Sequence, residues 1–161
     1  MSADTANEVT YNGLYRHGVD EKRRLAIPFR WRPDKPAKSA KSVEEVEFTL
    51  LLWKKFGAGA CLRVLPPAQW AKLQAEVDAR PNSDPTKPAL KRMLGTQSIQ
   101  VKLDTANRIC IPEDMKVEAG IGDEAVLAGL LNRFEIWSPE RYATLRSADS
   151  ALEAEGMRDL E

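Results

Sequence analysis

The chain has few of the residues that build metal centres and disulfide frameworks. Its 161 residues include only two cysteines and one histidine, and Cys61 and Cys110 lie far apart in the sequence. Because zinc sites need clustered Cys and His ligands, we expect no metal and no cofactor. We expect no disulfide either, and we interpret both cysteines as small buried hydrophobic residues of a cytoplasmic protein.

Long apolar segments and catalytic patterns are also missing. No apolar run approaches the roughly 20 residues that cross a bilayer, so we expect no membrane contact. Residues 1–10 are polar and have no apolar signal-peptide core, so we interpret them as a loose tail. No nucleophile–base pattern, phosphate loop or pair of carboxylates in a plausible cleft stands out. We therefore expect neither an enzyme nor a small-molecule substrate.

The chain has no excess of positive or negative charge, but its charged residues are unevenly distributed. The net charge is zero, which by itself argues against nucleic-acid binding. Residues 16–41, however, contain nine Lys or Arg against three Asp or Glu, and residues 147–161 contain one Arg against five acidic residues. A basic patch can bind phosphates while an acidic tail cancels the total. An ordinary mixed surface is the alternative interpretation.

One short pattern occurs twice. Residues 19–28 (VDEKRRLAIP) align with residues 103–112 (LDTANRICIP), and both contain apolar-Asp-x-x-x-Arg-apolar-x-Ile-Pro. A second pair, residues 65–70 and 137–142, follows in the same order. An internal repeat constrains the whole architecture, so we predict two copies of one unit related by a pseudo-two-fold axis. The first copy is longer, and we assign its extra residues to a basic insertion at about 32–44.

Hydrophobic periodicity predicts the elements of each copy. Alternation of apolar and polar residues on both sides of each Asp-x-x-x-Arg predicts a β-hairpin at the start of each copy. Later strand pairs are predicted at 48–53 with 60–65 and at 125–131 with 134–137. Helices are predicted to begin near Pro67, Pro85, Pro112 and Ser138. The predicted fold class is mainly β with flanking helices (α+β).

We divide the chain into five parts on this basis. They are the polar tail (1–10), a first repeat (11–80), a linker helix (81–95), a second repeat (96–146) and an acidic C-terminal helix or tail (147–161).

The ordered set of motifs resembles the MraZ family, bacterial regulators built from two SpoVT/AbrB-type repeats. The resemblance rests on residues 15–28, 103–112 and 129–137, with 91–94 at the position of the family's linker helix. It implies one double-split β-barrel-like unit per protomer and a closed homo-oligomeric ring. It also implies a nucleoid-associated, sequence-specific DNA-binding regulator that represses its own division and cell-wall operon. The Asp-x-x-x-Arg hairpins would then bind short promoter repeats in double-stranded DNA.

The turns depart from the family's Lys-Gly-Arg pattern. Arg23 and Asn107 occupy the glycine positions, and Ala106 replaces the second lysine. Glycine favours a left-handed backbone, asparagine tolerates it and arginine does so poorly. We therefore expect two unequal DNA faces. The first turn is either reshaped, or Arg23 adds a phosphate contact.

The resemblance assigns candidate DNA-binding roles to Arg24, Arg108, Lys22, Arg23 and Asn107. Arginine can bond guanine edges or phosphate, but Arg24 and Arg108 can instead pair with Asp20 and Asp104. A polyanion repels carboxylates, so we expect these aspartates to shape the turns and orient the arginines. For Lys22 and Arg23, two interpretations stay open: they bind phosphate, or they are ordinary solvent-exposed residues. For the basic residues from Arg30 to Lys41, the solvent-exposed interpretation is favoured.

Two further alternatives concern assembly and function. Asn132, Arg133 and Phe134 are predicted at the interface between protomers, with a plain turn as the alternative. Zero net charge and the missing turn glycine also allow a ring-forming scaffold that binds proteins and has weak or lost specific DNA binding. An AbrB-type antitoxin is disfavoured because such proteins usually have a single repeat.

Overall fold

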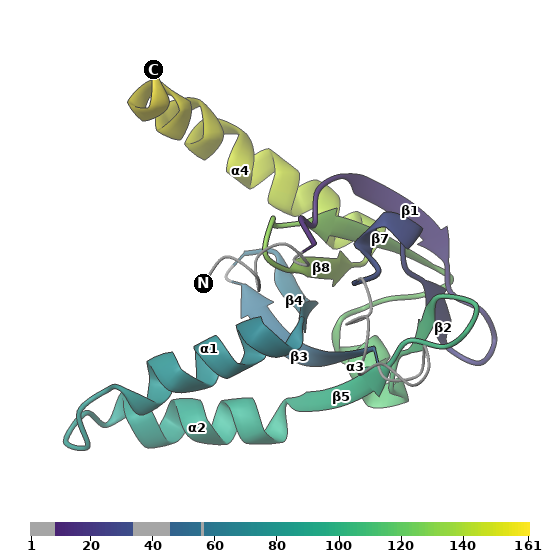
Figure 1. Ribbon diagram of the computed structural model, residues 1–161. Helices are drawn as coiled ribbons and strands as arrows, with labels where there is room; N and C mark the ends of the chain where they lie inside the picture. The colour runs from purple at the N-terminus through teal and green to yellow at the C-terminus, as the bar shows by residue number, and fades with distance from the viewer. Residues whose placement is uncertain (1–8, 34–45, 56) are drawn as a thin grey trace.

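The computed structural model describes residues 9–33, 46–55 and 57–161, and two antiparallel sheets organise these ranges (Figure 1). Most of the predicted tail and basic insertion, including Lys35, Lys38 and Lys41, lies outside the described residues. Strands and helices combine in an α+β arrangement, so the predicted class is confirmed. None of the described helices is both long enough and apolar enough to cross a membrane.

The larger sheet has six strands in the order β1-β7-β8-β4-β3-β5. Its strands are β1 (Leu14–Gly18), β3 (Glu47–Lys55), β4 (Gly59–Leu65), β5 (Ser98–Lys102), β7 (Glu124–Gly129) and β8 (Phe134–Trp137). The smaller sheet pairs β2 (Arg24–Ala26) with β6 (Arg108–Cys110).

Strands of the two copies are exchanged in both sheets. β1 pairs with β7, β5 pairs with β3, and β4 meets β8 at the centre of the larger sheet. The order is therefore symmetric about its centre, as a pseudo-two-fold arrangement requires. The prediction of a hairpin within each copy was wrong about the partners, because β2 pairs with β6 and meets its own copy's first strand only at the bridge Val19↔Leu25. A strand of three residues gains little from one short hairpin, so it takes the equivalent strand of the other copy.

The helices pack against strands of the larger sheet, and the longer ones project beyond the body (Figure 1). They are α1 (Pro67–Asp78), α2 (Thr86–Thr96), α3 (Glu113–Glu118) and α4 (Pro139–Leu160). The predicted start of α4 is confirmed, since the Ser138 hydroxyl accepts the Arg141 N–H at 3.1 Å. The α1–α2 hairpin and α4 leave the body at opposite ends of one side (Figure 1).

An aromatic cluster ties the smaller sheet to the core. The short 3-10 helix Phe29–Trp31 follows β2 and carries Trp31 into the centre, where its ring lies 4.7 Å from that of Phe134. The Trp31 indole N–H donates to the Asn12 carbonyl at 3.0 Å. Full burial of such a side chain stabilises the fold by roughly 1.5–3 kcal/mol. The position of β2 is therefore fixed by the core.

The two cysteines have different environments. Cys61 is fully buried, as predicted. Cys110 is exposed, so its predicted burial was wrong. The reason is strand alternation, because Ile109 and Ile111 face the core and Cys110 between them faces outward.

Candidate nucleic-acid interface

The short sheet of β2 and β6 forms a two-stranded ribbon on the protein surface. Leu25 lies opposite Ile109 in this ribbon, and their exposed fractions are 0% and 1%. Neighbouring residues along a strand point to opposite faces. Arg24 and Arg108 therefore share the outer face, as diagonal neighbours about 7–8 Å apart.

Asp20 organises the turn before β2. Its Oδ1 accepts the N–H groups of Lys22 and Arg24 at 2.9 and 2.8 Å, and its Oδ2 accepts the Arg24 Nε–H at 2.7 Å. The Arg24 N–H is the main cause that lowers the pKa of Asp20, and the Arg24 guanidinium and Lys22 N–H add to it. The carboxylate thus fixes the turn and one edge of the guanidinium together.

Asp104 makes the same set of bonds in the turn before β6. Its Oδ1 accepts the N–H groups of Ala106 and Arg108 at 2.9 and 2.8 Å, and its Oδ2 accepts the Arg108 Nε–H at 3.1 Å. Partial burial by itself would raise the pKa of Asp104, but the Arg108 N–H and guanidinium outweigh it and lower the pKa. The two turns therefore have the same internal geometry.

Both arginines keep part of the guanidinium available. The Arg24 and Arg108 side chains are 34% and 32% exposed. In each, the bond to aspartate uses Nε, and within the described ranges the Nη atoms make no hydrogen bond. The aspartate pair and a contact with DNA are therefore compatible. The pair holds the arginine while its outer edge still carries donors.

The residues at the glycine positions both adopt the left-handed conformation. Arg23 has φ 61° and Asn107 has φ 64°, so the first turn is not reshaped. Reciprocal bonds between the copies hold them there. Arg23 Nε donates to the Ile111 carbonyl at 3.0 Å, and Asn107 Nδ2 donates to the Ile27 carbonyl at 2.6 Å. Each turn is thus anchored on the β-strand end of the other copy.

Arg32 is a site residue whose contact sequence reasoning missed. Its Nη1 donates to the Asn107 Oδ1 at 2.7 Å, and the side chain is half-buried. The contact brings a cation to the second turn, where Ala106 stands in place of a lysine. The two residues are 75 positions apart, and no local pattern indicates that they meet. Lys22, in contrast, is exposed on the first turn.

The predicted interface residues lie in the turn between β7 and β8 and at the first position of β8. Asn132 is exposed and donates from Nδ2 to the Gln69 Oε1 at 3.3 Å, and Arg133 is half-buried. Phe134 is completely buried, because β8 is a central strand with both faces covered. Its side chain belongs to the protomer's core and cannot reach another protomer. An interface at Asn132 and Arg133 stays a prediction.

The ribbon offers donors for anions rather than ligands for metals. In the described part of the chain, no three His, Cys, Asp or Glu side chains come together as a metal site. The ribbon carries Arg24 and Arg108, with Lys22, Arg23 and Arg32 beside them. Such an array can bind phosphates and the acceptor atoms of base edges.

Comparison with known proteins adds a second line of support. The family model described as "MraZ protein, putative antitoxin-like" matches residues 94–159, which cover the second copy and α4. The chain is 38% identical to the transcriptional regulator MraZ of Roseiflexus castenholzii over 86% of this chain and 88% of that protein. It is 33% identical to the protein of that name from Thermomicrobium roseum, over 81% and 83%. For Thermus thermophilus the identity is 32%, over 81% and 83%.

Proposed function

The chain belongs to the MraZ family, and we propose that it is a sequence-specific DNA-binding repressor of its own division and cell-wall operon. One observation carries this proposal. The β2–β6 ribbon presents Arg24 and Arg108 on one outer face, each held by an aspartate. The relatives are named transcriptional regulators rather than enzymes, which agrees with a binding role.

The dimensions of the ribbon suit a DNA groove. The major groove of B-DNA is about 12 Å wide and admits a two-stranded β-ribbon. An arginine in that groove can donate two parallel bonds to O6 and N7 of guanine. Arg24 and Arg108 are therefore assigned to base recognition. Lys22 and Arg23 are assigned to phosphates, which set position and affinity rather than sequence.

A ring of protomers supplies the affinity that a neutral chain would otherwise lack. Each protomer contributes two arginine turns, and a closed homo-oligomer multiplies them on one surface. Linked sites raise overall affinity by roughly 10²–10⁴ without new contacts. Repeated promoter sites and association with the nucleoid follow from this arrangement.

The test is fluorescence anisotropy with DNA from upstream of the protein's own operon, against scrambled DNA, over a salt series. The double variant Arg24→Ala/Arg108→Ala should lose the preference for the upstream DNA and keep the oligomer. Arg80→Ala is the matched control, because Arg80 also pairs with an aspartate four residues away but lies at the tip of the α1–α2 hairpin. Undiminished preference in the double variant would refute the proposal.

Cys110 gives an independent readout. Its exposed thiol lies on the ribbon opposite Arg24, whereas Cys61 is fully buried. Alkylation of the folded protein should therefore modify Cys110, and bound upstream DNA should slow the reaction several-fold. If both DNAs bind equally weakly and neither slows the alkylation of Cys110, a ring-forming scaffold is favoured instead. The zero net charge is the observation that suggests this alternative.

A further inference from the structure

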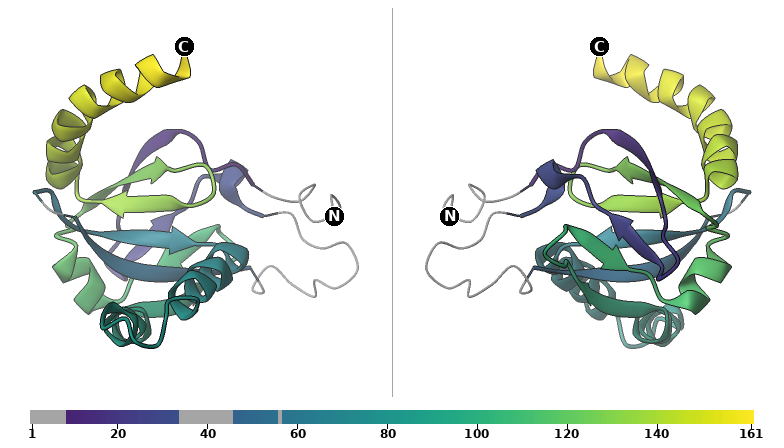
Figure 2. Two further views of the ribbon diagram at one scale, coloured as in Figure 1. Left: turned by 90° about the vertical axis from the view of Figure 1, so that its left-hand side faces the viewer. Right: turned by 90° about the vertical axis from the view of Figure 1, so that its right-hand side faces the viewer.

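One face of the larger sheet packs on the aromatic core, and the opposite face carries a charged patch at its centre. On β4, Leu62 and Val64 belong to the core, so Arg63 between them points to the opposite face. Glu135 on β8 lies beside Arg63 in the sheet. The α1–α2 hairpin and α4 stand apart in both views of Figure 2, and each covers its own apolar cluster on this face. The charged patch therefore lies between the two helical elements.

Glu135 uses both of its oxygens within the protomer. Its Oε2 accepts the Arg63 Nε–H at 3.3 Å, and its Oε1 accepts the Trp137 indole N–H at 2.9 Å. The side chains of Arg63 and Glu135 are only 15% and 4% exposed. The Arg63 guanidinium also lies over the Trp53 ring, 3.9 Å from its centroid. This carboxylate thus balances the charge of one arginine and has no oxygen left for a second.

A second arginine beside this pair has no acceptor. The Arg133 Nε is buried, and among the residues that the structure describes it donates to none. Burial and the positive charge of Arg133 lower the pKa of Arg63, because the two cations repel each other. Buried donors and buried charges are stable when they are hydrogen-bonded and paired. The geometry around Arg133 therefore favours a negatively charged acceptor.

A small cavity opens beside Arg133, between α1, β4 and the turn from β7 to β8. Its volume is about 90 Å³. Its polar lining consists of three cations, one carboxylate and two amides: Arg63, Arg133, Lys72, Glu76, Gln69 and Asn132. Even with Glu135 counted, the cations exceed the carboxylates. Because a water molecule takes up roughly 30 Å³ of liquid, the cavity holds about three waters or one small oxyanion.

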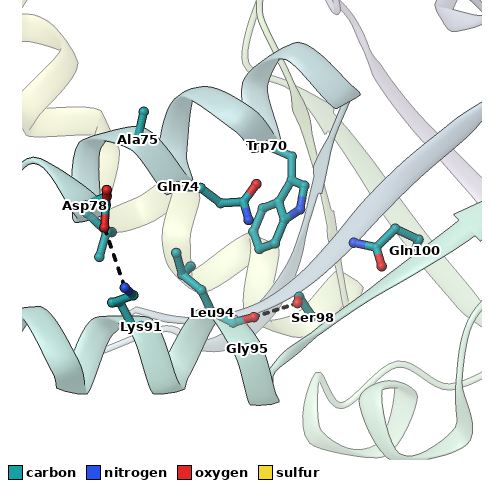
Figure 3. Close-up of a pocket in the computed structure, with 10 residues that line it drawn as sticks. Trp70, Gln74, Ala75, Asp78, Lys91, Leu94, Gly95, Ser98 and Gln100 are labelled. Carbon is teal, nitrogen blue, oxygen red and sulfur yellow. Dashed lines mark hydrogen bonds and ion pairs between the residues drawn. The ribbon is translucent and has the colours of Figure 1, made fainter.

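The larger groove between α1, α2 and β5 differs in this respect (Figure 3). Its volume is about 590 Å³, and Lys91 is the one cation among the described residues that line it. Lys91 already pairs with Asp78, and Figure 3 shows the two side chains pointing toward each other. The larger groove therefore leaves no cation available for an anion, whereas the small cavity has one.

We propose that the cavity beside Arg133 binds one phosphate group, either as inorganic phosphate or as the terminal phosphate of a small monoester. Arg133 donates to the phosphate oxygens, and Arg63 and Lys72 contribute positive charge. A phosphate accepts paired bonds from arginine. As a monoester it carries about 1.5–2 negative charges at pH 7, so it suits three cations better than a carboxylate does.

This site is separate from the proposed DNA interface. Leu25 and Ile109 attach the β2–β6 ribbon to the core, which lies on the other face of the larger sheet from the cavity. A phosphate bound beside Arg133 is therefore not a phosphate of the DNA that the ribbon would bind. The inference goes beyond the proposed function and does not depend on it.

Equilibrium dialysis of the full chain against radiolabelled inorganic phosphate tests the site. We expect one phosphate per chain, and Arg133→Gln should weaken binding by about ten-fold or more, since a charged hydrogen-bond donor is lost. Glu76→Gln should strengthen binding by about two- to five-fold, because it removes a negative charge from the rim. Arg80→Gln is the matched control and should bind like the wild type, because Arg80 pairs with Asp84 outside the cavity.

Competition identifies the source of the phosphate group. Stronger displacement by ribose 5-phosphate than by unlabelled phosphate would assign the site to a monoester, and the reverse order would assign it to free phosphate. Acetate at the same concentration should displace little. Equal displacement by acetate would show a carboxylate site and would overturn the proposal.

Three further results would overturn it. The first is the absence of phosphate binding in the wild type, and the second is its loss in Arg24→Ala/Arg108→Ala, which would place the anion on the ribbon. The third comes from Arg133→Gln in phosphate-free buffer. This variant breaks no bond and removes a repulsion, so its Tm should equal or exceed that of the wild type. A lower Tm, or a smaller oligomer in sedimentation velocity, would show that Arg133 serves the fold or the predicted protomer interface instead.

Discussion

The turns at residues 20–24 and 104–108 have the same backbone but differ in charge. In both, an aspartate accepts two backbone N–H groups and the Nε–H of an arginine four residues later. The first turn adds Lys22 and Arg23, whereas the second has Ala106 and Asn107 and receives Arg32 from the other copy. Because the backbone is the same although the charges differ, the geometry of the turn depends on the aspartate and on the left-handed residue. The positions between them are free to vary in charge.

Single arginine variants give the largest expected effect on this comparison. Arg24→Ala and Arg108→Ala should each reduce specific affinity by about 10–100-fold, because one bidentate contact to a base is worth roughly 1–3 kcal/mol. Equal geometry predicts equal losses, measured by anisotropy on upstream DNA at one salt concentration. A loss confined to one variant would show that only one turn reads bases.

Glycine substitutions at the left-handed positions should separate the turns by stability. Asn107→Gly removes bonds to the Ile27 carbonyl and from Arg32, so we expect a loss of about 1–2 kcal/mol. Arg23→Gly removes one bond but also relieves a strain of roughly 1–2 kcal/mol, so we expect little change. Urea unfolding measures both. Equal destabilisation would mean that Arg23 carries no strain.

Exchanging charge between the turns should change the salt dependence of binding. Lys22→Ala should flatten the log–log slope by about 0.9 for each phosphate that the protein no longer neutralises, and Ala106→Lys should steepen it by a similar amount. Sequence preference should change little in either case. The measurement is affinity across a salt series. If the slope of log affinity against log salt concentration is unchanged in both variants, Lys22 contacts no phosphate and is an ordinary solvent-exposed residue.

The smallest effect concerns pH and should be shared by both turns. The folded pKa values of Asp20 and Asp104 lie below the ordinary 3.8. Their stabilising contribution is therefore present above that value and is lost as the pH falls through the lower folded pKa. In thermal unfolding from pH 7 to pH 3, Asp20→Asn/Asp104→Asn should flatten the acidic end of the Tm curve. If the Tm of the double variant falls at acidic pH as steeply as that of the wild type, other carboxyl groups cause the fall.

Local signals in the sequence predicted much of this fold. Ser138 followed by Pro139 marks the start of α4 because both the cap and the fixed proline φ act within one turn. Asn107 occupies a glycine position of the resembled family's pattern, and asparagine tolerates the left-handed conformation that it adopts. The α+β class followed from periodicity along each element.

Partners distant in the sequence could not be predicted in this way. Each short strand could pair within its own copy or with the equivalent strand, and periodicity alone does not distinguish the two. The same limit hid the bond from Arg32 to Asn107, which depends on how the copies interlock. The exposure of Cys110, in contrast, follows from strand alternation between Ile109 and Ile111 and could have been predicted from the sequence. Leu25 and Ile109 are partners across the β2–β6 pair and belong to one core cluster, so this pairing forms together with the whole core.

The exchange of strands between the copies has a consequence for the DNA sequence itself. A dimer of identical chains presents identical recognition elements, so its operator tends to be a palindrome. In the proposed function, one chain holds both recognition turns in a pseudo-two-fold frame, and mutation can alter either turn alone. If this protomer reads DNA as proposed, its operator needs no mirror-related halves, and the proposed ring would be served by sites repeated in one direction.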